Sequence, residues 1–316
     1  FQRMMNTVGG FLKFYNSYST AQISCITPYM YGSKQSSGST LSAAEDAELI
    51  LVFGSSPAET RQGGAVSHYD YAHMREKTKG KIYVIDPRMN DSVMGHSDQW
   101  LPINPGTDAA LVAGIAHWLI KNDKVDTEFL HKYCVGFDAE HMPSDAKQQT
   151  NFKDYVQGAY DNTPKTPEWA SEICGASPEA IRNLARAMGK DHKVGFLVST
   201  ASARINNTDN LPQLVMTVGA MGGHMGKSGH MTGSTMHVTS GNGGPALIKA
   251  GKDGLPEIKN PVDDHINGNE VWDAVIDGTY TFTGTKHYDP AEKRDIDIHV
   301  IYHSSGNKLQ TNVGMA

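Results

Sequence analysis

The sequence predicts an α/β fold built around a parallel sheet. Short, almost continuous apolar runs at residues 48–53, 81–85 and 193–198 are typical of strands buried on both faces. Helical patterns separate these runs, and this alternation favours a right-handed arrangement of parallel strands. With 39% hydrophobic and 20% charged residues, the 316-residue chain can bury a large core and has the length of about two domains.

The expected elements follow in order along the chain. Residues 1–40 are polar and punctuated by glycine, and we expect one helix there, near residues 4–15. The buried strand 48–53 ends in a Gly-Ser-Ser-Pro turn, and the strand 81–85 ends in Asp-Pro-Arg. Other strands are expected at 99–103, 193–198 and 296–302, and helices at 66–78, 108–120, 127–133, 151–160, 166–173, 177–188 and 211–221.

Capping residues and glycine refine this pattern. Thr166 and Ser177 each precede Pro and Glu, which predicts helix starts with a hydroxyl cap. Many of the 32 glycines fall in residues 219–244, which predicts a loop that wraps around something. The polar residues 250–290 are expected to form a surface insertion.

Composition excludes several classes of protein. The formal net charge of −6 argues against a nucleic-acid partner, and no apolar run is long enough to cross a bilayer. Cys25, Cys134 and Cys174 are too far apart for a zinc or iron–sulfur motif. Because the chain starts without Met and ends in a loop-like segment, we expect a piece of a longer protein.

Polar residues follow the predicted strands where they end, at the sheet edge where α/β proteins bind ligands. Asp86 can bind a ribose hydroxyl there, or simply form the turn before Pro87. Asp108 begins a helix, so its carboxylate can complement the helix dipole or accept hydrogen bonds from a guanine base. The first strand-end loop is not G-x-G-x-x-G, which disfavours a dehydrogenase with a nicotinamide cofactor.

Five stretches resemble the catalytic subunits of the dimethyl sulfoxide reductase family of molybdopterin enzymes, above all the anaerobic dimethyl sulfoxide reductases. They are residues 15–31 (YNSYSTAQISCITPYMY), 52–61 (VFGSSPAETR), 84–88 (VIDPR), 98–114 (DQWLPINPGTDAALVAG) and 165–186. The Y-S-T-A-Q and P-G-T-D-A-A-L segments, with I-D-P-R between them, are the most specific.

The resemblance implies a cofactor, molybdenum bis(molybdopterin guanine dinucleotide). Ser19 takes the position of the family's catalytic serine, which ligates molybdenum, and a hard alkoxide oxygen suits a high-valent metal. Relatives often carry Asn where this chain has Ser55 and Ser56. The residues implied to contact the two dinucleotides are Gly54, Ser55, Ser56, Pro57, Thr60, Asp86, Arg88, Gly106, Asp108, Ser199, Arg204, Gly226, Ser228, Gly229, Ser305 and Asn307.

The implied architecture consists of Rossmann-like α/β domains, without the N-terminal iron–sulfur domain and C-terminal barrel of the family. Residues 1–40 would carry the molybdenum ligand, 41–190 would form a Rossmann-like dinucleotide-binding domain, and 191–316 would form part of a second cofactor-binding domain with a glycine-rich loop. A 4Fe-4S cluster belongs to the longer parent protein, and this chain contains no ligands for it. By itself the chain is expected to hold the cofactor weakly or not at all.

The implied activity is the reduction of a small S-oxide or N-oxide by oxygen-atom transfer to molybdenum, as in anaerobic respiration. The implied partners are an iron–sulfur electron-transfer subunit and a membrane-anchor subunit. The parent enzyme would then lie in the periplasm or at the outer face of the cytoplasmic membrane. Two alternatives stay open: a non-catalytic domain without cofactor, and another molybdopterin oxidoreductase, such as a selenate or other oxyanion reductase.

Overall fold

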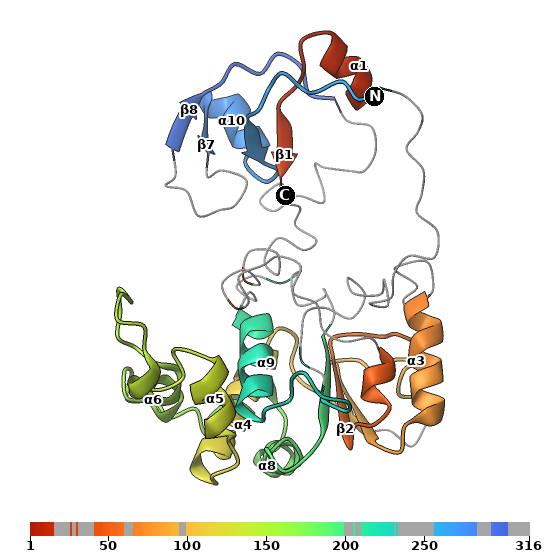
Figure 1. Ribbon diagram of the computed structural model, residues 1–316, viewed down its shortest axis with the longest axis vertical. Coiled ribbons are helices and arrows are strands. Elements are labelled where there is room, and N and C mark those ends of the chain that lie inside the picture. Colours follow the sequence, from red (N-terminus) through yellow and green to blue (C-terminus); the bar gives the residue numbers. More distant parts are fainter. Residues whose placement is uncertain are drawn as a thin grey trace. The chain divides into compact units, whose positions relative to one another are not determined.

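The computed structural model describes residues 1–15, 26, 30, 41–59, 66–94, 99–198, 205, 210–230, 232, 256–282 and 292–302. The chain divides into two units (Figure 1). The larger unit is formed by residues 26–244, and the smaller one by residues 1–25 and 245–316. In the described part of the chain, no helix is long and apolar enough to span a membrane.

The larger unit is built on a four-stranded parallel sheet in the order β4-β3-β2-β5. Because Phe53 pairs with both Ile85 and Val198, the strands β2, β3 and β5 end together at one edge. All residues of β2 and β5 are buried, and the predicted parallel α/β sheet is confirmed. The strands are β2 (Leu49–Phe53), β3 (Lys81–Ile85), β4 (Gln99–Leu101) and β5 (Val194–Val198).

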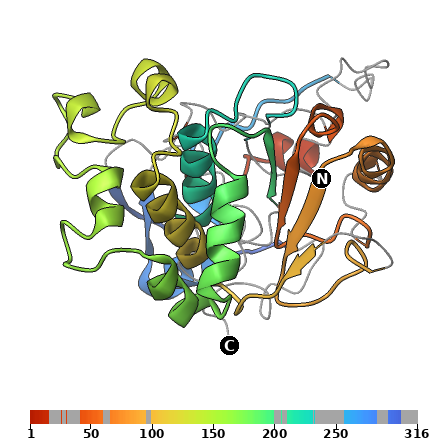
Figure 2. The ribbon, with the colours of Figure 1, turned by 90° about the horizontal axis from the view of Figure 1, so that it is seen from below.

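Alternate residues of β2 enter two different cores. Leu51 and Phe53 pack into a large core with helices α4, α8 and α9, whereas Ile50 and Val52 pack with α3. Helices therefore cover both faces of the sheet, and Figure 2 shows α4 and α8 on the opposite side from α3. These helices are α3 (Val66–Lys77), α4 (Asp108–Lys121), α8 (Pro178–Ala187) and α9 (Asn210–Met221).

Shorter helices complete the larger unit, and side-chain caps fix where several of them begin. The hydroxyls of Thr166 and Ser177 accept hydrogen bonds from the N–H groups of Trp169 and Ala180, as the sequence predicts. Asp126 caps α5 in the same way. These elements are η1 (Leu41–Ala44), α5 (Thr127–Tyr133), η2 (Ala139–His141), α6 (Phe152–Gln157) and α7 (Pro167–Cys174).

The smaller unit has regular structure that the sequence did not predict. In place of one helix near residues 4–15, the chain forms α1 and then a strand, β1, which pairs in parallel with β6. Within residues 250–290, expected to be a surface insertion, Ile266, Ala274 and Tyr280 form a small core. The elements are α1 (Gln2–Thr7), β1 (Lys13–Tyr15), β6 (His265–Asn267), α10 (Val271–Asp277), β7 (Thr279–Phe282) and β8 (Glu292–Asp295).

The predicted strand at 296–302 was wrong. The strand β8 ends at Asp295 and pairs antiparallel with β7, and the residues after it pair with no strand in the described part of the chain. Val300 is 84% exposed, so the second half of this run is not buried. The expected domain boundary at 190/191 also falls inside the larger unit, because β5 joins the sheet of β2 along its whole length.

Candidate cofactor site at the sheet edge

Two buried polar residues form hydrogen bonds with the loop after β2 and hold it in position. Gly54 turns the chain with φ of 50°, and its N–H donates to the carbonyl of Ile85. The side chain of Asn90 donates to the carbonyl of Ser55, and the Ser92 hydroxyl accepts from the N–H of Ala58 at 3.1 Å. Both Asn90 and Ser92 are fully buried. The loop Gly54-Ser55-Ser56-Pro57 is therefore fixed in position, although sequence reasoning did not single out these two residues.

Asp86 lies at the end of β3 and is oriented by its neighbours. Its Oδ1 accepts from the N–H of Arg88 at 2.8 Å, and its Oδ2 accepts from Asn90 at 3.3 Å. The indole N–H of Trp100 donates to the Asp86 carbonyl at 2.8 Å. Both interpretations of Asp86 are thus compatible with the structure, because the carboxylate closes the turn and keeps lone pairs for a ligand.

Arg88 does not extend freely beside Asp86. Its guanidinium contacts both carboxylate oxygens of Glu59, at 2.7 and 3.3 Å, and so links the two strand-end loops. The hydrogen bonds and the charge of Arg88 lower the pKa of Glu59. The pair is exposed, and a dinucleotide phosphate would have to compete with Glu59 for this arginine.

Asp108 is the first residue of α4 and is partly buried. Burial raises the pKa of Asp108 to about 6, its own N–H partly offsets this effect, and the charge of Asp86 adds to it. No lysine, arginine or histidine pairs with this carboxyl among the residues that the structure describes. Gly106 precedes it with φ of 76°, a conformation that favours glycine.

Gly226, Ser228 and Gly229 do not join this edge. The Ser228 hydroxyl donates to the carboxylate of Asp46, and the Gly229 N–H donates to the Ala43 carbonyl at 2.9 Å. Asp46 and Ala43 precede β2, so this loop lies at the amino ends of the strands. A five-residue strand separates the two edges by roughly 16 Å. The structure therefore does not bring these three residues together with Asp86 and Asp108.

The reason is the return path of α9. Twelve helical residues span about 18 Å, enough to carry the chain back along the whole sheet. The loop that follows is then fixed by His224, which is fully buried and lies 2.9 Å from the Met188 carbonyl through Nε2. The remaining expected site residues lie outside the described residues: Ser19, Thr60, Ser199, Arg204, Ser305 and Asn307.

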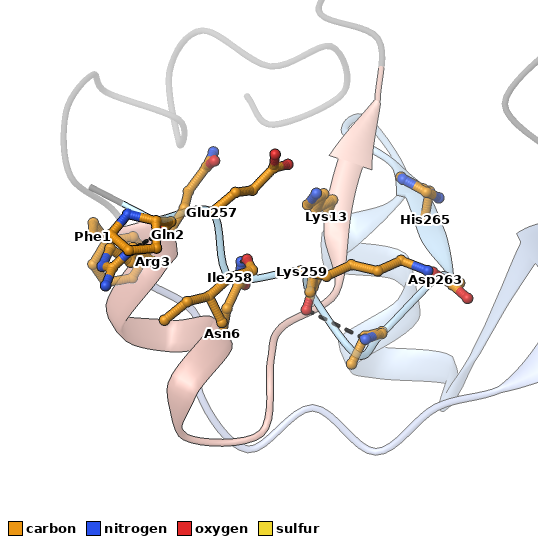
Figure 3. Close-up of a pocket in the computed structure, with 13 residues that line it drawn as sticks. Phe1, Gln2, Arg3, Asn6, Lys13, Glu257, Ile258, Lys259, Asp263 and His265 are labelled. Atoms are coloured by element: carbon orange, nitrogen blue, oxygen red, sulfur yellow. Dashed lines mark hydrogen bonds between the residues drawn. The ribbon is translucent and has the colours of Figure 1, made fainter. Parts of the chain in front are cut away.

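The smaller unit has a separate pocket among α1, β1 and residues 256–263 (Figure 3). Lys13 and Lys259 bring positive charge to its lining, and Glu257 and Asp263 bring negative charge. None of the expected cofactor-binding residues that the structure describes lines it. The mixed charge selects no class of ligand.

The sheet edge suits a ligand rich in hydrogen-bond donors. Asp108 and Asp86 present two carboxylates there, and Asp108 is partly desolvated, with no cation among the described residues to compensate it. A nucleoside supplies such donors through its base and its ribose. The residues present therefore fit the nucleotide end of a dinucleotide.

Comparisons with known proteins show the family of the chain. The family described as molybdopterin oxidoreductase matches residues 1–311. The chain belongs to the molybdopterin oxidoreductase family. Its membership implies a cofactor of molybdenum and molybdopterin.

Two relatives in this family are dimethyl sulfoxide reductases DmsA, from Haemophilus influenzae and Escherichia coli K12. They are 36% and 33% identical to this chain over 97% of its length and 37% of theirs. The trimethylamine-N-oxide reductase of Haemophilus influenzae is 27% identical over the same shares. The chain thus spans about 37% of the length of these relatives.

A solved structure supports the fold. Acetylene hydratase from Pelobacter acetylenicus superposes with a TM-score of 0.52 at 20% identity, over 73% of this chain and 28% of the other. At this identity the likeness concerns the fold alone.

Proposed function

We propose that this chain is part of the catalytic subunit of a molybdenum enzyme that reduces S-oxides or N-oxides. The edge of the sheet formed by the carboxyl ends of its strands would hold the guanosine end of one molybdopterin guanine dinucleotide. Family membership and the names of the relatives, dimethyl sulfoxide and trimethylamine-N-oxide reductases, support the reaction class. When bound, the molybdenum centre supplies oxygen-atom transfer and two-electron redox chemistry.

Asp108 is the observation that carries the proposed binding mode. A partly buried carboxylate with no cation beside it among the described residues gains most from a ligand that donates two parallel N–H bonds, as the Watson–Crick edge of guanine does. Asp86 is already oriented by Asn90 and by the turn, and its free lone pairs suit a ribose hydroxyl. The loop from Gly54 to Pro57 would close the same side of the nucleotide.

Ser19 remains the proposed molybdenum ligand. Its oxygen would hold the metal while the substrate oxide binds beside it. Thr60, Ser199, Arg204, Ser305 and Asn307 would add contacts to the dinucleotides. An iron–sulfur subunit and a membrane-anchor subunit would deliver electrons, with the enzyme at the outer face of the cytoplasmic membrane.

The test of the binding mode is Asp108→Asn in the enzyme that carries this sequence, produced with ample molybdenum. The amide cannot accept both guanine donors, so we expect the guanine nucleotide and molybdenum released from purified protein to fall at least tenfold. Asp273→Asn is the matched control, because Asp273 is an exposed acid in the first turn of α10. Full cofactor content in Asp108→Asn would refute the proposed role.

Ser19→Ala tests the reaction separately. We expect oxide reduction to be abolished while the fold and the guanine nucleotide content are retained. A panel of dimethyl sulfoxide, trimethylamine N-oxide and selenate, assayed with an artificial electron donor, distinguishes the reaction classes. Unchanged turnover in Ser19→Ala, or turnover of selenate alone by the unchanged enzyme, would contradict the proposal.

A further inference from the structure

Two histidines and two acids meet where α5 gives way to η2, in the larger unit. The Nε2 atom of His131 lies 2.9 Å from Oδ2 of Asp138, and the rings of His131 and His141 stack with centroids 3.7 Å apart. Potential ligand atoms of His131, Glu140 and His141 all lie within 4.8 Å of one another. The cluster plays no part in the proposed cofactor site.

The backbone around this cluster is firmly held. Leu130, beside His131, and Phe137, beside Asp138, are both buried in the main core. The N–H of Gly136 donates to the His141 carbonyl at 2.9 Å, which closes the loop. The backbone that carries the side chains of this cluster is therefore fixed in position, as a specific binding site needs.

Helix capping explains only part of this arrangement. Asp138 accepts from the N–H of His141 at 3.2 Å and so caps η2, and it also contacts the His131 ring. Burial by itself would raise the pKa of Asp138, but the hydrogen bonds and charge that His131 and His141 supply together outweigh it, so the pKa lies below the usual range. The His141 ring is held less firmly: its Nδ1 is buried and lies 3.4 Å from Oδ1 of Asp138, too poorly placed for a hydrogen bond with any described residue.

We propose that His131, Glu140 and His141 bind a divalent transition metal of the zinc class, with Asp138 orienting the histidines. Imidazole nitrogens combined with a carboxylate suit zinc better than calcium or magnesium, which prefer oxygen ligands alone. Ligand atoms of a tetrahedral zinc lie about 3.3 Å apart, so side-chain rotations that move each ligand atom by about 1 Å would bring the three atoms to this spacing. His131 and His141 are each about one-third exposed and Glu140 is exposed, which leaves them free to rotate.

The charge of the site and the contacts of Asp138 with the histidines both suit a divalent metal ion. The two carboxylates offset a divalent cation, and both histidines are needed in their neutral form. A carboxylate that contacts a metal-bound histidine fixes the orientation of the ring and strengthens the ligand. Such a metal would join the last turn of α5 to η2.

The experiment uses the full chain, stripped of metal with a chelator and titrated with zinc at pH 7.5. We expect one zinc per chain at the tightest site and a rise in the melting temperature, because the metal binds only the folded site. His141→Gln and Glu140→Gln should each weaken this binding at least tenfold. Glu140 is exposed, so its replacement leaves the fold intact even if His141→Gln does not.

His299→Gln is the matched control, because His299 contacts Asp297 at 2.9 Å but is exposed, and no other histidine among the described residues contacts it. Its zinc affinity should equal that of the unchanged chain. Binding should also disappear at pH 5, where imidazoles are protonated. Equal affinity in Glu140→Gln and the unchanged chain, or no zinc above that held by a variant lacking both His131 and His141, would overturn the proposal.

Discussion

At Asp108, the ionised form that the proposed nucleotide site needs is also the form that lowers the stability of the cofactor-free chain. Burial raises the pKa of Asp108 to about 6, so the folded chain favours the protonated carboxyl. The protonated carboxyl contributes fully to the stability of the folded chain below the pKa of the unfolded state, near 4. This contribution is lost as the pH rises through 6. At neutral pH the charged carboxylate destabilises the cofactor-free chain by about 2 kcal/mol, allowing for its partial contact with solvent.

Asp108→Asn should therefore stabilise the cofactor-free chain at pH 8 and have little effect at pH 4. The expected gain at pH 8 is about 2 kcal/mol, which corresponds to several degrees in melting temperature. Thermal unfolding at the two pH values measures it, with Asp273→Asn as the exposed control. An equal shift at both pH values would mean that the ionisation of Asp108 is not what matters.

Single residues also show how far the sequence predicts the site. Asp86 was singled out because it ends a strand of a parallel sheet, and Asp108 because it begins a helix, and neither rule needs coordinates. Their proposed roles at the nucleotide came from the family resemblance. Asn90 and Ser92 were missed because, in sequence, they are ordinary turn residues, and only their complete burial shows that they hold the Gly54 loop. Gly226 was expected to contact the second dinucleotide, and its position at the amino ends of the strands could not be predicted, because loop composition does not reveal where α9 ends.

At the scale of elements, the contact between α4 and α7 depends on one glycine. A Cβ added at Gly114 would lie 2.6 Å from the Cβ of Ala170, closer than two carbons can approach. Alanine normally stabilises a helix by about 1 kcal/mol relative to glycine, so propensity and packing make opposite predictions here. Because Ala170 has no flexible end that can move aside, packing should dominate.

Gly114→Ala is accordingly expected to destabilise the chain by about 1–3 kcal/mol. Adding Ala170→Gly should recover most of that loss, since it removes the atom that clashes. Urea unfolding of the two single variants and the double variant gives the coupling between the positions. Additive effects, or a Gly114→Ala chain more stable than the original, would show that the helices can separate at no cost.

Elements differ in how well the sequence predicts them. The strand 81–85 and the helix 127–133 have the predicted bounds, because burial on both faces and a good cap are local signals. The run at 296–302 has five apolar or aromatic residues of seven, yet it pairs with no strand in the described part of the chain. A strand needs a neighbour for its backbone hydrogen bonds, and the presence of that neighbour is not a property of the run itself.

At the scale of the whole molecule, buried residues form separate cores in the two units. Among the described residues, the buried members of the cores around β2 lie within residues 41–221, whereas Ile266, Ala274 and Tyr280 belong to the smaller unit. The sequence could not predict this division, because residues 1–25 and 245–316 are brought together only by long-range contacts, such as the pairing of β1 with β6. Units with separate cores can open independently.

Ala274→Asp should therefore unfold the smaller unit and leave the larger one intact. Ala274 is 1% exposed, so its replacement places an unpaired carboxylate in a core that has three buried residues in the described part of the chain, at a cost of several kcal/mol. Hydrogen exchange should show lost protection at residues 1–15 and 256–282 and unchanged protection at residues 99–198. Ile276→Asp, on the same helix and 80% exposed, should change neither region. Loss of protection in both units on Ala274→Asp would instead mean that the chain unfolds as one cooperative body.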